Sequence, residues 1–383
     1  MGSKRILLTG GGTGGHISPL LAVAHELKKT DPTCYIIYTG ERNGKFAHML
    51  EGNDDVDEVV SVFAGKFRRY HGESWVRRVL DLKTVLLNLR DACYVVLGIF
   101  QGLFLVKRLR PDIVLLKGGF VGVPIGLASA FWRVPFVTHD SDALPGLANR
   151  LVSRWAKYHA TGMPPEFYSY PPDSMRYVGV LTTAGYKPVD TALQAAYKKE
   201  LSLPEQSRVM LVTGGSTGAV RLNEAFKQIA PKLLEDYSDL HIVHQVGKGQ
   251  AGVYGDYEHQ RLEVLEFLQQ LYRYSGAADV VVTRAGANAL AEFGVQGKAC
   301  VVVPNPLLTG GHQLKNAENL MRHGAVVVVD EQDFKKDTSS LDRAIRGLLQ
   351  DKSQRLELAK KLRSISVPDS AHKLALILLD TKP

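Results

Sequence analysis

Residues 5–16 read RILLTGGGTGGH, an apolar run that ends in a glycine-rich turn. The apolar half predicts a buried strand, and the pattern over Leu21–Lys29 predicts a helix after the turn. Glycines at such a turn let backbone N–H groups approach a phosphate, and the positive end of the following helix favours an anion. Gly10, Gly12 and Gly15 satisfy G-x-G-x-x-G, a dinucleotide-binding signal that is weak by itself.

Two further glycine-rich turns follow apolar runs in the same way. TGGSTGA at 213–219 follows Arg208–Thr213, and KGGFVG at 117–122 follows Asp112–Leu116. No Lys-Ser/Thr pair of a P-loop follows the first turn at 10–15, which disfavours an ATPase. Because three such turns fall at the carboxyl ends of predicted strands, we expect a cleft that holds two phosphorylated ligands.

Short β-branched runs alternate with helical patterns along the whole chain, for example Leu222–Glu235 and Gln313–Arg322. Apolar strands that alternate with amphipathic helices indicate parallel sheets covered on both faces, an α/β class of two doubly wound Rossmann-like domains. The other predicted strands are Cys34–Thr39, Glu58–Phe63, Phe136–Thr138, Tyr177–Val180, His241–Val246, Glu263–Phe267, Val280–Thr283, Ala299–Val303 and Ala325–Val329.

The glycine-rich turns that open the two halves begin at Gly10 and Gly214, so the halves repeat one pattern. We expect the boundary just beyond the strand at 177–180, giving an N-terminal domain over 1–180 and a C-terminal domain over 181–368. A terminal helix at about Asp369–Leu379, within residues 369–383, is expected to pack back on the first domain.

The 383 residues are 45% hydrophobic and 22% charged, which excludes a disordered, collagenous or polytopic membrane protein. The three cysteines, Cys34, Cys93 and Cys300, form no C-x-x-C pair, so neither a disulfide framework nor a zinc ribbon is indicated. The N-terminus has no apolar stretch long enough for a signal peptide. We therefore expect a cytoplasmic protein.

Most of the net charge of +8 lies between Ser61 and Arg110, where ten basic and three acidic residues leave +7. The uncharged run Ala92–Val106 is fifteen residues long, short of the roughly 18–20 needed to span a bilayer. Basic residues mixed with aromatics suit an interfacial membrane surface, and a buried helix with solvated basic neighbours is equally compatible. Nucleic acid is a weaker alternative. The candidate membrane-face residues are Phe67, Arg68, Arg69, Trp75, Arg77 and Arg78.

Four motifs resemble, in order and spacing, those of the MurG family of N-acetylglucosaminyltransferases. They are GGTGGH at 11–16, GGS-x-GA at 214–219 with Arg221-x-Asn223, RAGA at 284–287 leading to Glu292, and HQ-x-x-NA at 312–317. The resemblance extends from residue 5 to about residue 330. It implies two Rossmann-like domains that face a cleft, the GT-B type, and an inverting transferase that needs no metal or other cofactor.

The resemblance also implies the substrates and the location. The donor would be UDP-GlcNAc, bound by the C-terminal domain. The acceptor would be undecaprenyl-pyrophosphoryl-MurNAc-pentapeptide, bound by the N-terminal domain at an anionic membrane surface on the cytoplasmic face, with no nucleic-acid partner. The protein would add the GlcNAc of lipid II in peptidoglycan synthesis.

The resemblance assigns donor contacts by position. Glu292 would accept hydrogen bonds from the ribose hydroxyls, since two carboxylate oxygens suit a vicinal diol. Leu268 would pair with uracil through its backbone, and Gln313 beside His312 would contact the sugar. A solvated helix position is the structural alternative for Glu292. The remaining donor-binding candidates are Thr13, Gly14, Gly15, Asp142, Ser216, Ala287, Asn288, Ala289, Leu290 and Ala291.

His16 is the candidate general base, because a histidine pKa near 6.5 suits removal of the acceptor proton. Capping of the helix, or contact with a phosphate, is an equally weighted role for His16, and Asp142 is the alternative base. The acceptor- or phosphate-binding candidates are Gly12, Gly118, Gly119, Phe120, His139 and Asn223.

The sequence departs from the family pattern at several positions, among them two short segments at 139–142 and 179–183. Asp142 stands where the family has Asn, and Thr183 stands where it has Arg. Phe120 replaces a common Tyr, and Gly311 replaces an Asp. Asp140-x-Asp142 also resembles the metal site of other sugar transferases, but the flanking residues match the metal-free family. These changes bear on donor contacts and on acceptor choice.

Other functions remain open. A glycolipid glycosyltransferase or a UDP-GlcNAc 2-epimerase could share this architecture. A non-catalytic UDP-sugar sensor would bind the nucleotide without turnover. The hypothesis of an NAD-dependent oxidoreductase would rest on the G-x-G-x-x-G motif alone and would leave the role of Glu292 unexplained.

Overall fold

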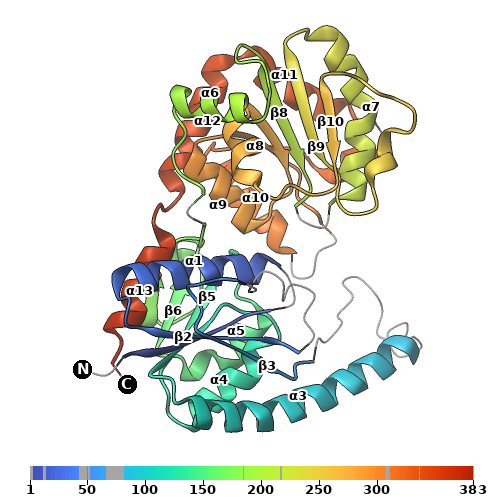
Figure 1. Cartoon of the computed structure of the whole chain (residues 1–383). Coiled ribbons are helices and arrows are strands. Elements are labelled where there is room, and N and C mark those ends of the chain that lie inside the picture. The colour runs from blue at the N-terminus through green and yellow to red at the C-terminus, as the bar shows by residue number, and fades with distance from the viewer. Residues whose placement is uncertain are drawn as a thin grey trace. The chain divides into compact units, whose positions relative to one another are not determined.

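The computed structural model describes residues 3–11, 14–42, 50, 52–65, 82–183, 185–215, 218–306, 311–335 and 337–382 (Figure 1). The chain divides into two compact units. Unit 1 comprises Met1–Thr183 and Asp369–Pro383, and unit 2 comprises Ala184–Pro368.

The described part of unit 1 is built on a sheet of seven strands that are all parallel to their neighbours, in the order β3-β2-β1-β4-β5-β6-β7. The strands are β1 (Arg5–Thr9), β2 (Tyr35–Glu41), β3 (Glu58–Val62), β4 (Ile113–Leu116), β5 (Phe136–Asp140), β6 (Tyr158–Thr161) and β7 (Met175–Tyr177).

Helices cover both faces of this sheet because successive buried side chains of each strand point to opposite faces. Ile6 and Leu8 pack with α1 (Gly14–Thr30) and α13 (Ser370–Asp380), which lie side by side in Figure 1. Leu7 packs on the other face with α3 (Leu82–Leu109) and α4 (Gly122–Phe131). Four further segments lie in the described part of unit 1: α5 (Leu147–Val152) and the 3-10 turns Ser153–Trp155, Pro165–Phe167 and Pro172–Ser174.

The described part of unit 2 repeats the pattern with six parallel strands in the order β10-β9-β8-β11-β12-β13. They are β8 (Arg208–Thr213), β9 (Leu240–Gln245), β10 (Leu262–Leu265), β11 (Val280–Thr283), β12 (Ala299–Val302) and β13 (Val327–Val328).

The helices of unit 2 also divide between the two faces of the sheet. Those in contact with the Met210 and Val212 face are α7 (Val220–Asp236) and α11 (Ser339–Gln350). The opposite face is covered by α8 (Leu271–Ala277), α9 (Ala287–Gln296) and α10 (His312–Arg322). The remaining segments are α6 (Thr191–Glu200), α12 (Lys352–Ile365) and the 3-10 turns Ala251–Tyr254 and Glu331–Lys335.

The predicted α/β class with two doubly wound sheets is confirmed. In each sheet the strand order reverses beside the first strand, between β1 and β4 in unit 1 and between β8 and β11 in unit 2. Ligands of open α/β sheets bind outside the carboxyl ends of the strands at such a reversal. All three glycine-rich turns of the sequence follow a strand that borders a reversal.

Two secondary-structure predictions were wrong. The strand β6 (Tyr158–Thr161) was missed because YHAT carries little apolar signal, although it pairs with both neighbours. The strand predicted at 177–180 instead covers Met175–Tyr177. The chain leaves the sheet after Tyr177, where the N–H groups of Val178 and Gly179 both donate to the Thr161 carbonyl.

Candidate functional site

In unit 1, the loops after β1 and β4 touch backbone to backbone. A Cβ on Gly119, whose φ is +76°, would lie 2.7 Å from the Gly11 carbonyl oxygen, and a Cβ on Gly11 would lie 2.8 Å from the Val121 side chain. Glycine is therefore required at both positions for the loops to meet. Gly14 and Gly15 begin α1, while Gly12 and Thr13 lie outside the described residues.

His16 lies in the first turn of α1, and its Cβ would lie 3.6 Å from a Cβ placed on Gly10. The pKa of His16 is lowered to about 4, chiefly by burial and then by the positive charge of Lys117, whereas Asp142 acts in the opposite direction. His16 is therefore neutral at pH 7 and can accept a proton.

The loop after β5 carries two aspartates with different surroundings. Asp140 is 5% exposed, and burial raises its pKa. Its carboxylate accepts hydrogen bonds from the Gly146 N–H at 3.0 Å, the Asn149 amide at 2.9 Å and the Tyr170 hydroxyl at 2.9 Å. Asp140 thus holds its own loop, whereas Asp142 lies within electrostatic range of His16 and Lys117.

His139 is fully buried, and its Nε2 lies 3.1 Å from the Gly179 carbonyl oxygen. Burial places its pKa well below the usual value, so the imidazole is neutral. This contact ties β5 to Gly179, in the segment that follows β7. The other acceptor candidates, Gly118 and Phe120, lie in the loop after β4.

In unit 2, the turn after β8 is held by a glutamine that sequence reasoning missed. Gln245, at the end of β9, accepts a hydrogen bond from the Thr213 hydroxyl and donates to the Gly215 carbonyl at 3.1 Å. Gly218 has a φ of +73°, and a Cβ there would collide with the Val246 carbonyl oxygen. Ser216 lies outside the described residues.

The loop after β11 leads directly into α9, whose N-cap Gly286 supplies no capping side chain. The N–H groups of a helix start of this kind can bind a phosphate. Ala287, Asn288, Ala289, Leu290 and Ala291 make up this first part of the helix. The Asn316 amide donates to the Ala285 carbonyl at 3.1 Å and thereby ties α10 to the same loop.

Glu292 lies in the second turn of α9, and Tyr186 forms a side-chain hydrogen bond with it. Burial raises the pKa of Glu292 to about 8, while the Tyr186 bond opposes that rise. Leu268 follows β10, and its side chain is 6% exposed in the core, an arrangement that fixes the local backbone.

The start of α10 carries His312 and Gln313, the two remaining candidates for binding the sugar-nucleotide donor. The Gln313 side-chain amide oxygen, Oε1, accepts a hydrogen bond from the Asn305 N–H at 2.9 Å. The Nδ1 atom of His312 is buried and has no hydrogen-bond partner among the described residues. The N-cap Gly311 takes a φ of +66°, which favours glycine at a position where the family has Asp.

Two charged groups near these loops were not singled out from the sequence. Glu331 is 3% exposed and forms ion pairs with Arg284, which is also buried, and with the half-exposed Arg221 at 3.1 Å. Glu331 thus joins the loop after β11 to the start of α7. Lys117, 4% exposed, donates from Nζ to the Ser141 hydroxyl at 2.6 Å.

Asn223 was predicted to bind acceptor or phosphate, and the structure places it on the core side of α7. Its side chain is fully buried in unit 2, where the amide donates to the Val246 carbonyl at 2.8 Å and Oδ1 lies 3.2 Å from His244 Nε2. Asn223 therefore supports the core beneath the turn after β8. The motif predicts only that Asn223 lies near the turn. The face of α7 on which it lies decides that its side chain contacts the core.

Comparison with known proteins identifies the family. The glycosyltransferase family 28 N-terminal domain matches residues 6–161, and the C-terminal domain of the same family matches residues 209–374. Two relatives are named UDP-N-acetylglucosamine–N-acetylmuramyl-(pentapeptide) pyrophosphoryl-undecaprenol N-acetylglucosamine transferase. The Lachnospira eligens protein is 34% identical over 92% of both chains. The Salinibacter ruber protein is 32% identical over 97% of this chain and 95% of its own.

Solved structures share the architecture. Acinetobacter baumannii MurG superposes with a TM-score of 0.72 at 24% identity, covering 99% of this chain and 100% of its own. A UDP-GlcNAc 2-epimerase from Neisseria meningitidis gives 0.63 at 14% identity over 98% and 100%. At these identities the structures establish the GT-B glycosyltransferase fold, and the sequence matches establish the family. The chain belongs to glycosyltransferase family 28.

Proposed function

We propose that the protein transfers N-acetylglucosamine from UDP-GlcNAc to the C4 hydroxyl of undecaprenyl-pyrophosphoryl-MurNAc-pentapeptide, the step from lipid I to lipid II in peptidoglycan synthesis. The observation that carries the proposal is the agreement among relatives. Those bearing this activity in their names align over 92–98% of this chain at 29–34% identity. Family membership also removes support from the oxidoreductase hypothesis.

Unit 2 supplies the groups that suit a UDP-sugar. The uncapped start of α9 would hold the diphosphate through its N–H groups. The Glu292 carboxylate would take the ribose diol, and Gln313 at the start of α10 would contact the sugar. As the bond to the sugar breaks, charge develops on the leaving diphosphate. Preorganised N–H groups and helix dipoles stabilise such charge.

Unit 1 supplies the groups that suit the acceptor. The loops after β1 and β4 would hold the acceptor pyrophosphate. Neutral His16 would take the proton of the C4 hydroxyl while that oxygen attacks the anomeric carbon. The new O4–C1 bond forms as the bond from C1 to the diphosphate oxygen breaks, and UDP leaves with the electron pair. Attack from the face opposite UDP inverts the anomeric centre.

A lipid-linked acceptor requires access to a membrane, and α3 offers an exposed apolar surface. One side of α3 packs on α4, while the other carries apolar side chains that are 50–68% exposed. We call these residues the α3 stripe: Leu86, Leu89, Val96, Leu97, Phe100 and Phe104. Because 28% of the most apolar window of α3 is buried, the exposure of α3 favours a surface role over a buried helix at 92–106.

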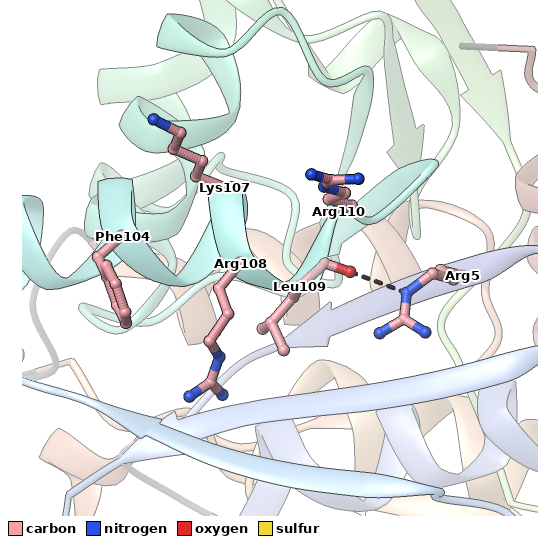
Figure 2. A pocket seen from close by; sticks show the side chains of 6 residues that line it. All are labelled: Arg5, Phe104, Lys107, Arg108, Leu109 and Arg110. Carbon is pink, nitrogen blue, oxygen red and sulfur yellow. Dashed lines mark hydrogen bonds between the residues drawn. The ribbon is translucent and has the colours of Figure 1, made fainter.

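Basic residues adjoin the C-terminal end of the α3 stripe. A pocket of about 630 Å³ is lined there by Phe104 and Leu109 together with four cations, Arg5, Lys107, Arg108 and Arg110. Figure 2 shows these six side chains. Arg5 Nε donates to the Leu109 carbonyl at 2.8 Å, which keeps this wall in place. Apolar side chains beside cations suit an anionic leaflet.

We therefore propose that the protein is peripheral at the cytoplasmic face of the membrane and docks through α3. Leu86–Leu109 has a mean hydropathy of 1.6 and is long enough to cross a bilayer, but length and composition alone are weak evidence. Packing of α3 along α4 favours an interfacial position. The earlier candidates Phe67, Arg68, Arg69, Trp75, Arg77 and Arg78 lie outside the described residues.

The test is transfer of radiolabelled GlcNAc from UDP-GlcNAc to a short-chain lipid-linked muramyl-pentapeptide, with UDP release measured in parallel. The proposal expects equal amounts of UDP and GlcNAc-MurNAc product, and loss of both in His16→Ala. Nucleotide binding without either product would indicate a sensor. A ManNAc product without acceptor would indicate the epimerase, and transfer to a different glycolipid would indicate another acceptor.

A further inference from the structure

Three residues at the carboxyl ends of β8 and β9 form a closed ring of hydrogen bonds. Thr213 and Gln245 are direct partners in the pairing of these strands, and both are buried. The Thr213 hydroxyl donates to Gln245 Oε1 and accepts from the Gly215 N–H at 3.1 Å. Gln245 Nε2 donates to the Gly215 carbonyl oxygen at 3.1 Å and so closes the ring. We call these contacts the Gln245 ring.

The Gln245 ring holds Gly215 at both its N–H and its carbonyl. The φ of Gly215 is +83°, a conformation that glycine adopts easily, and a glycine backbone rotates more freely than that of other residues. The carbonyl accepts a second hydrogen bond from the Gly218 N–H at 2.9 Å. Because its donors include a buried amide, the Gly215 carbonyl points into the unit. The ring thus fixes a peptide group that glycine alone leaves free to turn.

The space beside Gly215 is open. A Cβ on Gly215 would meet no atom within 4 Å among the described residues other than its chain neighbours. The turn follows β8, which borders the reversal of strand order where ligands of open α/β sheets bind. N–H groups attract an anion in such a turn, whereas the negative end of a carbonyl dipole repels one. An anion beside Gly215 therefore requires the carbonyl to stay inward.

We propose that Gln245 and Thr213 are positioning residues for the diphosphate of the sugar-nucleotide donor. They hold the Gly215 carbonyl inward and so keep its dipole from opposing the diphosphate. Both are buried, so they act through the turn after β8. The inference rests on the proposed function, which brings a nucleotide diphosphate to unit 2. It adds that affinity for the diphosphate, and not for the nucleoside, depends on a buried amide of the neighbouring strand.

The test compares the dissociation constants of UDP and uridine, measured by calorimetry or NMR titration, in the parent and in Gln245→Met. Methionine is similar in size but cannot donate to the Gly215 carbonyl. UDP binding is expected to weaken about 10-fold, because the diphosphate is charged. Uridine binding should change by less than about twofold. Unchanged UDP binding, or equal weakening of both ligands, would overturn the proposal.

Thr213→Val removes only the side of the ring that faces the turn. Gln245 Nε2 also lies 3.5 Å from the Glu266 carbonyl in the loop after β10, and this substitution leaves that contact in place. Valine keeps the shape of threonine without the hydroxyl, so UDP binding should again weaken relative to uridine binding. Thr213→Ser restores the hydroxyl and should return the UDP constant to within about twofold of the parent. A serine variant as weak as the valine variant would contradict the ring.

Gln296 provides a matched control in unit 2. It is fully buried, its Oε1 accepts from the Ser275 hydroxyl at 2.6 Å, and its Nε2 donates to the Tyr272 carbonyl at 2.7 Å. It is the last residue of α9, at the end away from the helix start. Gln296→Met removes the same two kinds of hydrogen bond, so it should lower stability without changing the ratio of UDP to uridine affinity. A comparable change of this ratio would attribute the effect to general loosening and overturn the proposal.

Hydrogen exchange of the Gly215 amide tests the ring without a nucleotide. Because this N–H donates to Thr213, its exchange in the parent should be at least ~10-fold slower than in Thr213→Val. Equal rates would show that the ring does not hold Gly215. A parent that binds no UDP would overturn the proposed function together with the diphosphate role. A parent that binds UDP, with an unchanged affinity ratio in the variants, would overturn only the role of Gln245 and Thr213.

Discussion

The Tyr186 hydroxyl donates a hydrogen bond to the Glu292 carboxyl group. Tyr186 lies in the segment that enters unit 2, and its ring packs edge-on against Tyr272 with the ring centroids 6.2 Å apart. The segment before α6 is thereby tied to the second turn of α9. A ribose diol at Glu292 would have to share this carboxyl group with the phenol.

This relationship predicts proton release when UDP-GlcNAc binds. With a pKa of about 8, Glu292 is mostly protonated at pH 7, whereas a diol that donates hydrogen bonds favours the ionised form. Binding should therefore lower the pKa of Glu292 and release a proton. Calorimetry at about pH 7 in two buffers of different ionisation enthalpy is expected to give different apparent enthalpies.

Glu292→Gln is the matching variant. It is expected to abolish the buffer dependence and to weaken donor binding at least ~10-fold, since hydrogen bonds to a charged group contribute about 1.5–3 kcal/mol. Unchanged affinity with unchanged proton release would show that Glu292 does not hold the ribose. Tyr186→Phe should retain the release, because the carboxyl group remains.

The α3 stripe predicts membrane binding that depends on single apolar side chains. Leu89 is 63% exposed, and Leu89→Ser should weaken binding to anionic vesicles about 10-fold, because burying a leucine contributes about 1.5–3 kcal/mol. Cosedimentation measures this. Leu356 on α12 is 61% exposed, and Leu356→Ser should leave binding unchanged. Equal losses of vesicle binding in both variants would contradict a specific role of α3 in membrane docking.

Two glycines in the turn after β8 distinguish the cost of backbone strain from the cost of a steric collision. Gly215 and Gly218 both have positive φ, of 83° and 73°. A Cβ on Gly215 meets nothing within 4 Å, whereas one on Gly218 would collide with the Val246 carbonyl. Gly215→Ala is expected to lower the free energy of unfolding by about 1–2 kcal/mol, because only backbone strain contributes to the cost. Gly218→Ala should cost about 1–3 kcal/mol more. Urea unfolding measures both, and equal costs would contradict the collision.

His244 predicts a loss of stability in acid. It is fully buried between Tyr254 and Asn223, and burial lowers its pKa to about 3. Below about pH 6.5 the unfolded chain binds a proton that the folded chain does not. The stability contribution is therefore complete above that pH and falls by about 1.4 kcal/mol per pH unit toward pH 3.

The matching variant is His244→Gln, which stays neutral throughout. It should lower the unfolding free energy at about pH 7 but reduce the loss between about pH 7 and pH 5. Urea unfolding at the two pH values gives this difference. The same pH dependence in the variant and the parent would assign the acid sensitivity to other groups.

Much of the fold could be predicted because local patterns coincide with buried strands. The apolar runs at 5–9, 208–213 and 280–283 are strands with the predicted limits. β6 could not be predicted, since Tyr158–Thr161 is a strand through its pairing with β5 and β7 rather than through its own residues. Glycine-rich turns were predictable because their chemistry is local.

The contacts within the candidate site were less predictable. Asn223 lies in a site motif yet points into the core, while Gln245 and Glu331, outside every motif, hold the turns of unit 2 in place. Nothing in the sequence links Lys117 to Ser141 or Tyr186 to Glu292. These pairs join segments distant in the chain, and only the packing of the strands and helices brings them together.

The order of the residues by itself determined two α/β units, their phosphate-suited turns and the family resemblance, because apolar periodicity and glycine act within a few residues. Only the tertiary structure decided which ionisable groups are buried and what faces them. Desolvation and neighbouring charges set the proton states of His16, Lys117 and Glu292, and both depend on segments that meet only in the folded chain.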